Sequence, residues 1–88
     1  MEKPWEEEIG TVSHYYNGIH IAAIAIEHGR LKVGDRLHFK GHTTDFEETI
    51  QEMQVNHSDV REAGMGAHVG VPVHDKVRAH DHVYIIHQ

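Results

Sequence analysis

Two glycines five residues apart, Gly29 and Gly34, constrain the fold of this chain more than any other feature. Each stands where the chain is expected to reverse, because glycine adopts the positive φ angles of tight turns at little steric cost. Residues 30–33 between them alternate basic and apolar side chains, so one side of this segment can enter a core while the other faces water. Such closely spaced reversals predict a compact β-barrel.

The first hairpin is predicted from residues 9–26. Residues 9–16 follow the period of two that is typical of a strand, and Asn17-Gly18 comes directly after them. This dipeptide between β-rich segments predicts a two-residue type I′ turn with positive φ at both positions. Residues 19–26 are then the returning strand, which is apolar on both faces.

Further strands are predicted at residues 36–40, 67–73 and 82–87, where apolar positions alternate with polar or small ones. Residues 45–56 are ambiguous. Their composition suits a helix with an N-cap at Thr44 or Asp45, whereas the surrounding pattern favours a strand, and both alternatives stay open at this point. About six short strands separated by turn signals predict an all-β barrel.

Composition and charge restrict the classes of function. The chain has 88 residues, a size that allows one domain. Its formal net charge of −6 disfavours unspecific binding to phosphate backbones, which requires clustered Lys and Arg. The absence of cysteine excludes disulfides and thiolate metal sites. We expect residues 1–8 to form an acidic tail and residues 9–88 to form the barrel domain.

The location of the protein is also an expectation from sequence. The acidic beginning of the chain is unlike a secretory signal, which has a basic segment followed by an apolar one. The longest apolar run, residues 21–26, is far shorter than the roughly 20 residues of a membrane span. We therefore expect a cytoplasmic protein that does not enter a membrane.

Three blocks of the sequence resemble the second domain of elongation factor Tu and its relatives. They are Ile9-Gly10-Thr11-Val12, the glycine-containing segment at residues 29–37, and the segment at residues 63–71 with its Val-Gly-Val strand. The resemblance covers residues 9–86. It implies a six-stranded Greek-key-like β-barrel and a strand, not a helix, over residues 45–55.

A subgroup of these relatives is more similar still. Stand-alone elongation factor-like proteins, and the C-terminal domain of collagenase-like peptidase-family proteins linked to tRNA hydroxylation, resemble this chain at Asp45-Phe46 and Glu52-Met53-Gln54. The chain lacks the phosphate loop of a GTPase, so nucleotide hydrolysis is not expected. Ala67 and His68 replace the acidic residue and the asparagine with which the factors help to hold aminoacyl-tRNA, so that mode of recognition is not expected either.

Eleven histidines suggest metal binding as one alternative. His80 and His82 would share one strand face, and imidazole with carboxylate support suits Zn, Ni or Cu. The histidines are scattered, however, and no compact ligand motif occurs, so they are interpreted as surface residues. No nucleophile motif is present either, and the sequence predicts neither a catalytic residue nor a cofactor nor a bound metal, so the protein is not expected to be an enzyme.

The favoured function is an interaction module in translation or tRNA-related processes. Basic side chains on strands near aromatic ones can hold RNA through phosphate contacts and base stacking. The candidate RNA-binding residues are Arg30, Lys32, Arg36, Lys40, Tyr15 and Tyr16. The alternative is a protein-binding accessory subunit of a larger enzyme, which the acidic net charge favours.

Overall fold

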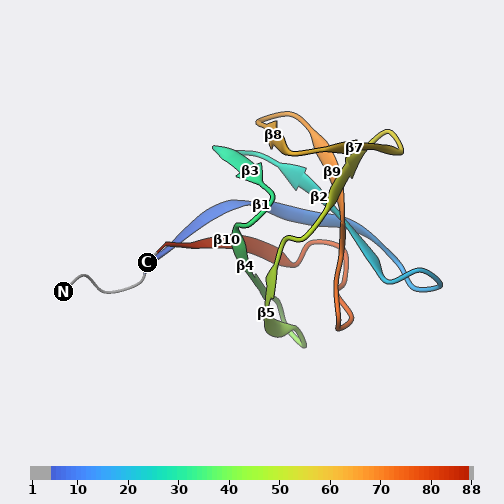
Figure 1. The fold of residues 1–88 in the computed structure, drawn as a ribbon. Coiled ribbons are helices and arrows are strands. Elements are labelled where there is room, and N and C mark those ends of the chain that lie inside the picture. The colour runs from blue at the N-terminus through green and yellow to red at the C-terminus, as the bar shows by residue number, and fades with distance from the viewer. Residues whose placement is uncertain (1–4, 88) are drawn as a thin grey trace.

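Every regular element in the structure is a β-strand. The computed structural model describes residues 5–87, and Figure 1 shows them as strands joined by turns, with no helix among them. The strands are β1 (Trp5–Tyr16), β2 (Ile21–Ile26), β3 (Arg30–Lys32), β4 (Arg36–Lys40), β5 (Asp45–Thr49), β6 (Met53–Val55), β7 (Ser58–Val60), β8 (Glu62–Gly64), β9 (His68–Pro72) and β10 (His82–His87). The all-β prediction is confirmed.

The strands form two sheets. Eight lie in one antiparallel sheet in the order β5-β4-β10-β1-β2-β9-β6-β7, and β3 pairs with β8 in a second sheet. The large sheet curls around the core but is not closed, because β5 and β7 are its two ends. Backbone hydrogen bonds from Gly34 to Ile50 and from Val33 to Arg61 tie the β3–β4 segment to the residues that directly follow β5 and β7. Ten strands replace the six expected, since four of them have only three residues each.

The core follows from the alternation within strands. In β4, Leu37 and Phe39 are fully buried, whereas Arg36 and Lys40 point to solvent. The same alternation buries Val83 in β10, which is hydrogen-bonded to β4. The largest fully buried side chains come from most parts of the chain, and they are Phe39, Ile9, Ile24, Leu31, Leu37, Ile50, Met53, Val12, Val69, Val71 and Val83.

Glycine turns were predicted correctly where a positive φ was needed. Gly29 has a φ of 69° and Gly34 has a φ of 101°, at the two ends of β3. Leu31 between them is fully buried, as its place in the alternating segment predicted. The short strand therefore inserts one apolar side chain between two reversals.

The turn predicted at Asn17-Gly18 was wrong in type. Tyr16 pairs with Ile21, so the loop has four residues, and the Ile19 N–H donates to the Tyr16 carbonyl at 3.2 Å. The positive φ of this loop, 57°, falls on His20. A register shift between Val12 and His14 adds a residue to β1, so the loop has four residues where the earlier register would leave three.

Residues 45–56 form strands, as the resemblance implied, and the helix alternative is wrong. Here β5 and β6 are separated by a break at residues 50–52, where the Ile50 side chain enters the core. Long-range pairing with β4 and β9 outweighs the local helix preference of this segment.

The N-terminal part of β1 overlaps the expected acidic tail. Trp5–Glu8 pair with residues 84–87 of β10, and Trp5 stacks on His87 with ring centroids 4.2 Å apart. Residues 1–4 of the expected tail lie outside the described residues. No helix in residues 5–87 is long and apolar enough to cross a membrane.

Candidate functional site

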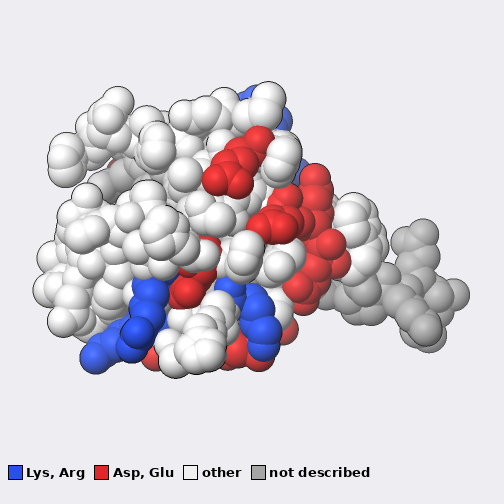
Figure 2. Space-filling model, turned by 180° about the vertical axis from the view of Figure 1, so that it is seen from behind, with Lys and Arg blue, Asp and Glu red and all other residues white. Residues whose placement is uncertain are grey.

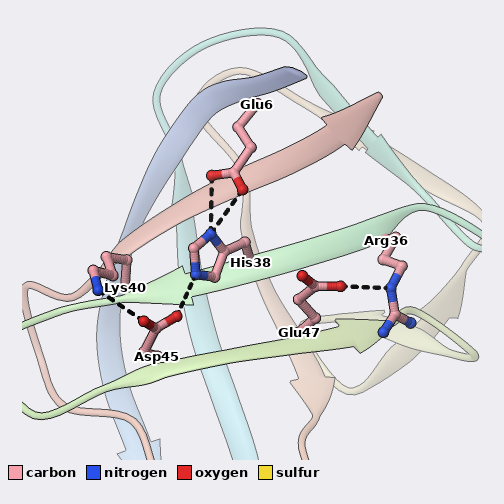
Figure 3. Close-up of polar contacts among 6 residues, drawn as sticks. All are labelled: Glu6, Arg36, His38, Lys40, Asp45 and Glu47. Atoms are coloured by element: carbon pink, nitrogen blue, oxygen red, sulfur yellow. Dashed lines mark hydrogen bonds and ion pairs between the residues drawn. The ribbon is translucent and has the colours of Figure 1, made fainter. Parts of the chain in front are cut away.

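Three of the four predicted RNA-binding cations form ion pairs with carboxylates on neighbouring strands. The pairs are Arg30–Glu62 at 3.4 Å, Arg36–Glu47 at 3.0 Å and Lys40–Asp45 at 2.8 Å. Figure 3 shows the last two on the outer face of β4 and β5. On the face seen in Figure 2, basic side chains form separate patches with acidic ones beside them. Because each pair offsets a positive charge, this set attracts phosphates less than the sequence suggested.

The two candidate tyrosines lie away from these cations. Lys40 is level with His82, and His82 is level with Thr11 of β1. Tyr15 and Tyr16 are four and five residues further along β1, which places them on the order of 13–17 Å beyond that level. The structure therefore does not bring the predicted basic and aromatic residues together.

Only one of these tyrosines is available for stacking. Tyr15 is half-buried against the core, and its hydroxyl is hydrogen-bonded to His20 Nδ1 at 3.1 Å. The Tyr16 side chain is exposed, and its ring meets the His14 ring edge-on with centroids 4.4 Å apart.

His38 joins three strands at the centre of the outer face (Figure 3). Its Nδ1 lies 2.9 Å from both carboxylate oxygens of Glu6 on β1, and its Nε2 lies 2.6 Å from Asp45 Oδ1 on β5. Partial burial lowers the pKa of His38, but the hydrogen bonds with Glu6 and Asp45 and the attraction of their charges raise it overall above its ordinary 6.5. Both ring nitrogens can donate only in the protonated ring, so this geometry favours an imidazolium.

The pair beside it is also charged. The hydrogen bond from Lys40, followed by that from His38, lowers the pKa of Asp45 below its ordinary 3.8. The same contact with Asp45 raises the pKa of Lys40 above 10.5. Asp45 is thus a carboxylate that already forms ion pairs with two side chains, Lys40 and His38.

Three more histidines contact carboxylates, and these contacts were not predicted from the sequence. The pairs are His82–Glu8 at 2.6 Å, His87–Glu7 at 2.9 Å and His74–Glu48. The metal-binding alternative assumed that His80 and His82 share one strand face. His80 instead lies in a turn, with a φ of 76°, before β10 begins at His82. In the part of the chain that the structure describes, no three His, Asp or Glu side chains are placed to hold one metal ion.

An apolar groove lies beside the β1–β2 hairpin. It has a volume of about 310 Å³, and its walls include Tyr16, Ile19, Ile21, His57 and Val69. Ile19 is 67% exposed and Tyr16 is 48% exposed, large values for apolar side chains. Ile19 was predicted to begin the returning strand of the hairpin. Its position directly after Asn17-Gly18 was the signal for an exposed loop residue.

A second, polar hollow lies between the β4–β5 turn and the β9–β10 connection. It has a volume of about 470 Å³, and Thr43, Lys76 and Arg78 are among the residues that line it. A functional role for Lys76 and Arg78 was not predicted from the sequence. Their alternation around the apolar Val77 was the available signal, because it places both side chains on the solvent side.

Comparison with known proteins places the chain beside proteases. No protein-family model matches it. It is 41% identical over 80 residues to an uncharacterized protease of Methanocaldococcus jannaschii, an alignment that covers 90% of this chain and 19% of that protein. It is 30% identical over 77 residues to a collagenase of Porphyromonas gingivalis, covering 86% of the chain and 21% of the collagenase. The chain thus spans about a fifth of the length of these curated relatives.

Solved structures show the same fold. The C-terminal domain of a Geobacillus thermoleovorans protein assigned to the U32 peptidases matches with a TM-score of 0.82 at 18% identity, covering 90% of this chain and 91% of that domain. Its selenomethionine variant matches with a TM-score of 0.81 at 19% identity, covering 88% and 96%. The chain is thus similar in fold to the C-terminal domain of that U32-assigned protein.

These findings correct one expectation and narrow another. The chain was expected to stand outside enzymes, but its homologues are named as proteases, which points to an enzyme family in which this chain corresponds to one domain. The collagenase-like part of the resemblance is confirmed, whereas the likeness to elongation factor Tu stays a prediction. The chain therefore has a barrel-like fold of the U32 C-terminal type.

Proposed function

We propose that this U32-type barrel binds polypeptide chains for a proteolytic enzyme, and that the polypeptide lies in the apolar groove beside Tyr16 and Ile19. The observation that carries the proposal is the exposure of these two side chains at the margin of a groove of about 310 Å³. The names of the relatives, protease and collagenase, supply the class of ligand.

The lining of the groove suits an extended polypeptide. Ile21 and Val69 provide apolar walls, and Tyr16 provides an aromatic edge. Gln54 and Asn56 at the groove carry amides that can donate to and accept from a peptide backbone. Proline-rich chains in the polyproline II conformation dock in grooves of this kind, with little conformational entropy to lose.

The RNA-binding interpretation has weaker support. It assigns phosphate contacts to Arg30, Lys32, Arg36 and Lys40, but three of these four are paired with carboxylates. Its stacking residue, Tyr16, borders the apolar groove and lies apart from those cations. RNA binding is therefore the competing outcome of a binding experiment.

The test is retention of the chain on immobilised gelatin, a denatured collagen, with immobilised tRNA as the second matrix. We expect the unaltered chain to bind gelatin and a Tyr16→Ala/Ile19→Ser variant to bind about tenfold more weakly, because two apolar anchors are lost. Met65→Ser is the matched control. Met65 is 72% exposed and does not line the groove, so gelatin binding should be unchanged.

Two results would overturn the proposal. One is a groove variant that stays folded by circular dichroism and binds gelatin as well as the unaltered chain does. The other is retention on tRNA alone that an Arg30→Glu/Lys32→Glu variant abolishes, which would support RNA binding instead.

A further inference from the structure

Two turns meet at one end of the barrel, and they contain none of the residues that line the apolar groove. Figure 1 shows the β4–β5 turn and the β9–β10 connection at the same end of the molecule. The two segments touch, since a Cβ added at Gly41 would lie 1.9 Å from a carboxylate oxygen of Asp81. The polar hollow of about 470 Å³ lies between residues 43–46 and residues 75–78.

This hollow carries two cations without a carboxylate partner. Val77 is 3% exposed, so Lys76 and Arg78 on either side of it both point outward and line the hollow. Among the described residues, neither side chain forms an ion pair, in contrast to Arg36 and Lys40. An unpaired guanidinium beside an unpaired ammonium attracts an oxyanion and can donate several hydrogen bonds to it.

The backbone of both walls is held in place. The Arg78 N–H donates to Asp81 Oδ2 at 2.8 Å, and the Asp81 N–H donates to the Arg78 carbonyl at 3.1 Å. Asp81 is only 6% exposed, so these two hydrogen bonds fix the backbone of the Arg78–Asp81 turn from its inner side. On the other wall, the Gly41 N–H donates to the Thr44 carbonyl at 2.8 Å. A preorganised site loses less entropy on binding than a mobile loop does.

The acidic groups at the hollow leave room for an anion. Asp45 accepts from His38 and Lys40, so its charge is already offset (Figure 3). Asp75 accepts from the Lys76 N–H at 2.8 Å, and its exposed charge opposes an anion. Asp75 and the nearly buried Asp81 form no ion pair among the described residues, so the two cations face two carboxylates. The attraction for an oxyanion therefore comes from the Lys76 and Arg78 side chains that line the hollow, not from an excess of positive charge.

We propose that this hollow binds a phosphate group of a small molecule, held by Lys76 and Arg78 with the Thr43 hydroxyl as an additional donor. Three phosphate oxygens match a fork of guanidinium, ammonium and hydroxyl donors. The acidic remainder of the chain repels a long polyanion, which favours a small ligand over RNA. This site is independent of polypeptide binding in the groove.

The test is a titration of the isotope-labelled chain with inorganic phosphate and pyrophosphate, followed by amide NMR shifts at constant ionic strength. We expect shifts at residues 43–46 and 75–78, and about tenfold weaker binding in a Lys76→Ala/Arg78→Ala variant. Lys32→Ala/Arg61→Ala is the matched control. It removes the same charge from two cations that form no ion pair among the described residues and do not line the hollow.

A further variant tests whether negative charge at the hollow weakens phosphate binding. Asp75→Asn removes the Asp75 charge and should tighten phosphate binding by about threefold to tenfold. The proposal is overturned if both double variants weaken binding equally, because the effect would then be one of overall charge. It is also overturned if no local shifts appear, or if a single-stranded RNA oligonucleotide binds through the same residues more tightly than pyrophosphate does.

Discussion

Gly10 lies where β1 comes very close to the backbone of β2. A Cβ added there would be 1.9 Å from the carbonyl oxygen of Ala25 and 3.0 Å from its carbonyl carbon. Backbone atoms in a paired strand cannot swing aside as the end of a long side chain does. Gly10→Ala should therefore lower the free energy of unfolding by about 3 kcal/mol, measured by chemical denaturation.

Gly18→Ala is the control for that substitution. A Cβ added at Gly18 meets nothing within 4 Å, and its φ is not positive. Its free energy of unfolding should stay within about 0.5 kcal/mol of the unaltered chain. Equal effects of the two substitutions would show that the close approach of β1 to β2 does not limit residue 10.

At the residue scale, the exposure of a side chain was more predictable from the sequence than its ion-pair partner. The alternation in residues 36–40 correctly indicated that Arg36 and Lys40 face solvent. It could not show that Glu47 and Asp45 lie opposite them, because that depends on the register between β4 and β5. Charges that look free along the chain are therefore offset across the sheet.

At the element scale, turns followed their steric requirements more closely than dipeptide preferences. Gly29 and Gly34 have the positive φ that their places between strands required. The two-residue turn predicted for Asn17-Gly18 occurs instead at Asn56-His57, with φ values of 52° and 65° between paired Val55 and Ser58. A bulge in β1 lengthened the first loop, and no local pattern in the sequence announces such a shift.

The contact between Glu6 and His38 helps to hold the first half of β1 to β4, and the raised pKa of His38 makes this contact pH-dependent. Since the folded pKa of His38 is raised, its stabilisation is complete below 6.5 and is lost as pH rises through the folded pKa. Since the folded pKa of Asp45 is lowered, its stabilisation is present above 3.8 and is lost as pH falls through the folded pKa. Both contributions coincide between these two values.

His38→Gln tests this dependence. Glutamine keeps a hydrogen-bonding side chain but has no charge to lose, so the variant should lose less stability than the unaltered chain as pH rises from about 6 to about 8. The measurement is Tm against pH for both proteins. The charged or titratable groups facing His38 are Glu6 and Glu8 on β1, His82 and Tyr84 on β10, Arg36 and Lys40 on β4, and Asp45 and Glu47 on β5. Parallel Tm curves would contradict a role for His38.

At the scale of the whole molecule, the all-β fold class was predictable from the sequence, whereas the order of the strands and their division into two sheets were not. Alternation and turn signals are local, and they were sufficient to predict an all-β domain. The eight-stranded order and the separate β3–β8 pair depend on contacts far apart in sequence, such as Gly34 with Ile50. The radius of gyration of 11.9 Å is close to the roughly 12 Å of a compact domain of this length, so the strands enclose one core.

That single core should unfold as one unit, and Phe39 is the residue with which to test it. Phe39 is fully buried and stacks on Phe46 of β5 with ring centroids 5.1 Å apart, so it joins the β4–β5 edge to the centre. Phe39→Ala should lower the free energy of unfolding by about 3–5 kcal/mol. Small domains have only about 5–15 kcal/mol in total, so the variant should unfold at much lower denaturant concentration.

The cooperativity of unfolding carries the sharper part of this prediction. If the open sheet curls around one core, tryptophan fluorescence from Trp5 on β1 and circular dichroism of the strands should give one midpoint in Phe39→Ala, as in the unaltered chain. Met65→Ala, at a residue 72% exposed, should move neither midpoint. Separate midpoints for the two probes would show that the β4–β5 edge unfolds independently, and that the open side of the sheet divides the barrel into two cooperative parts.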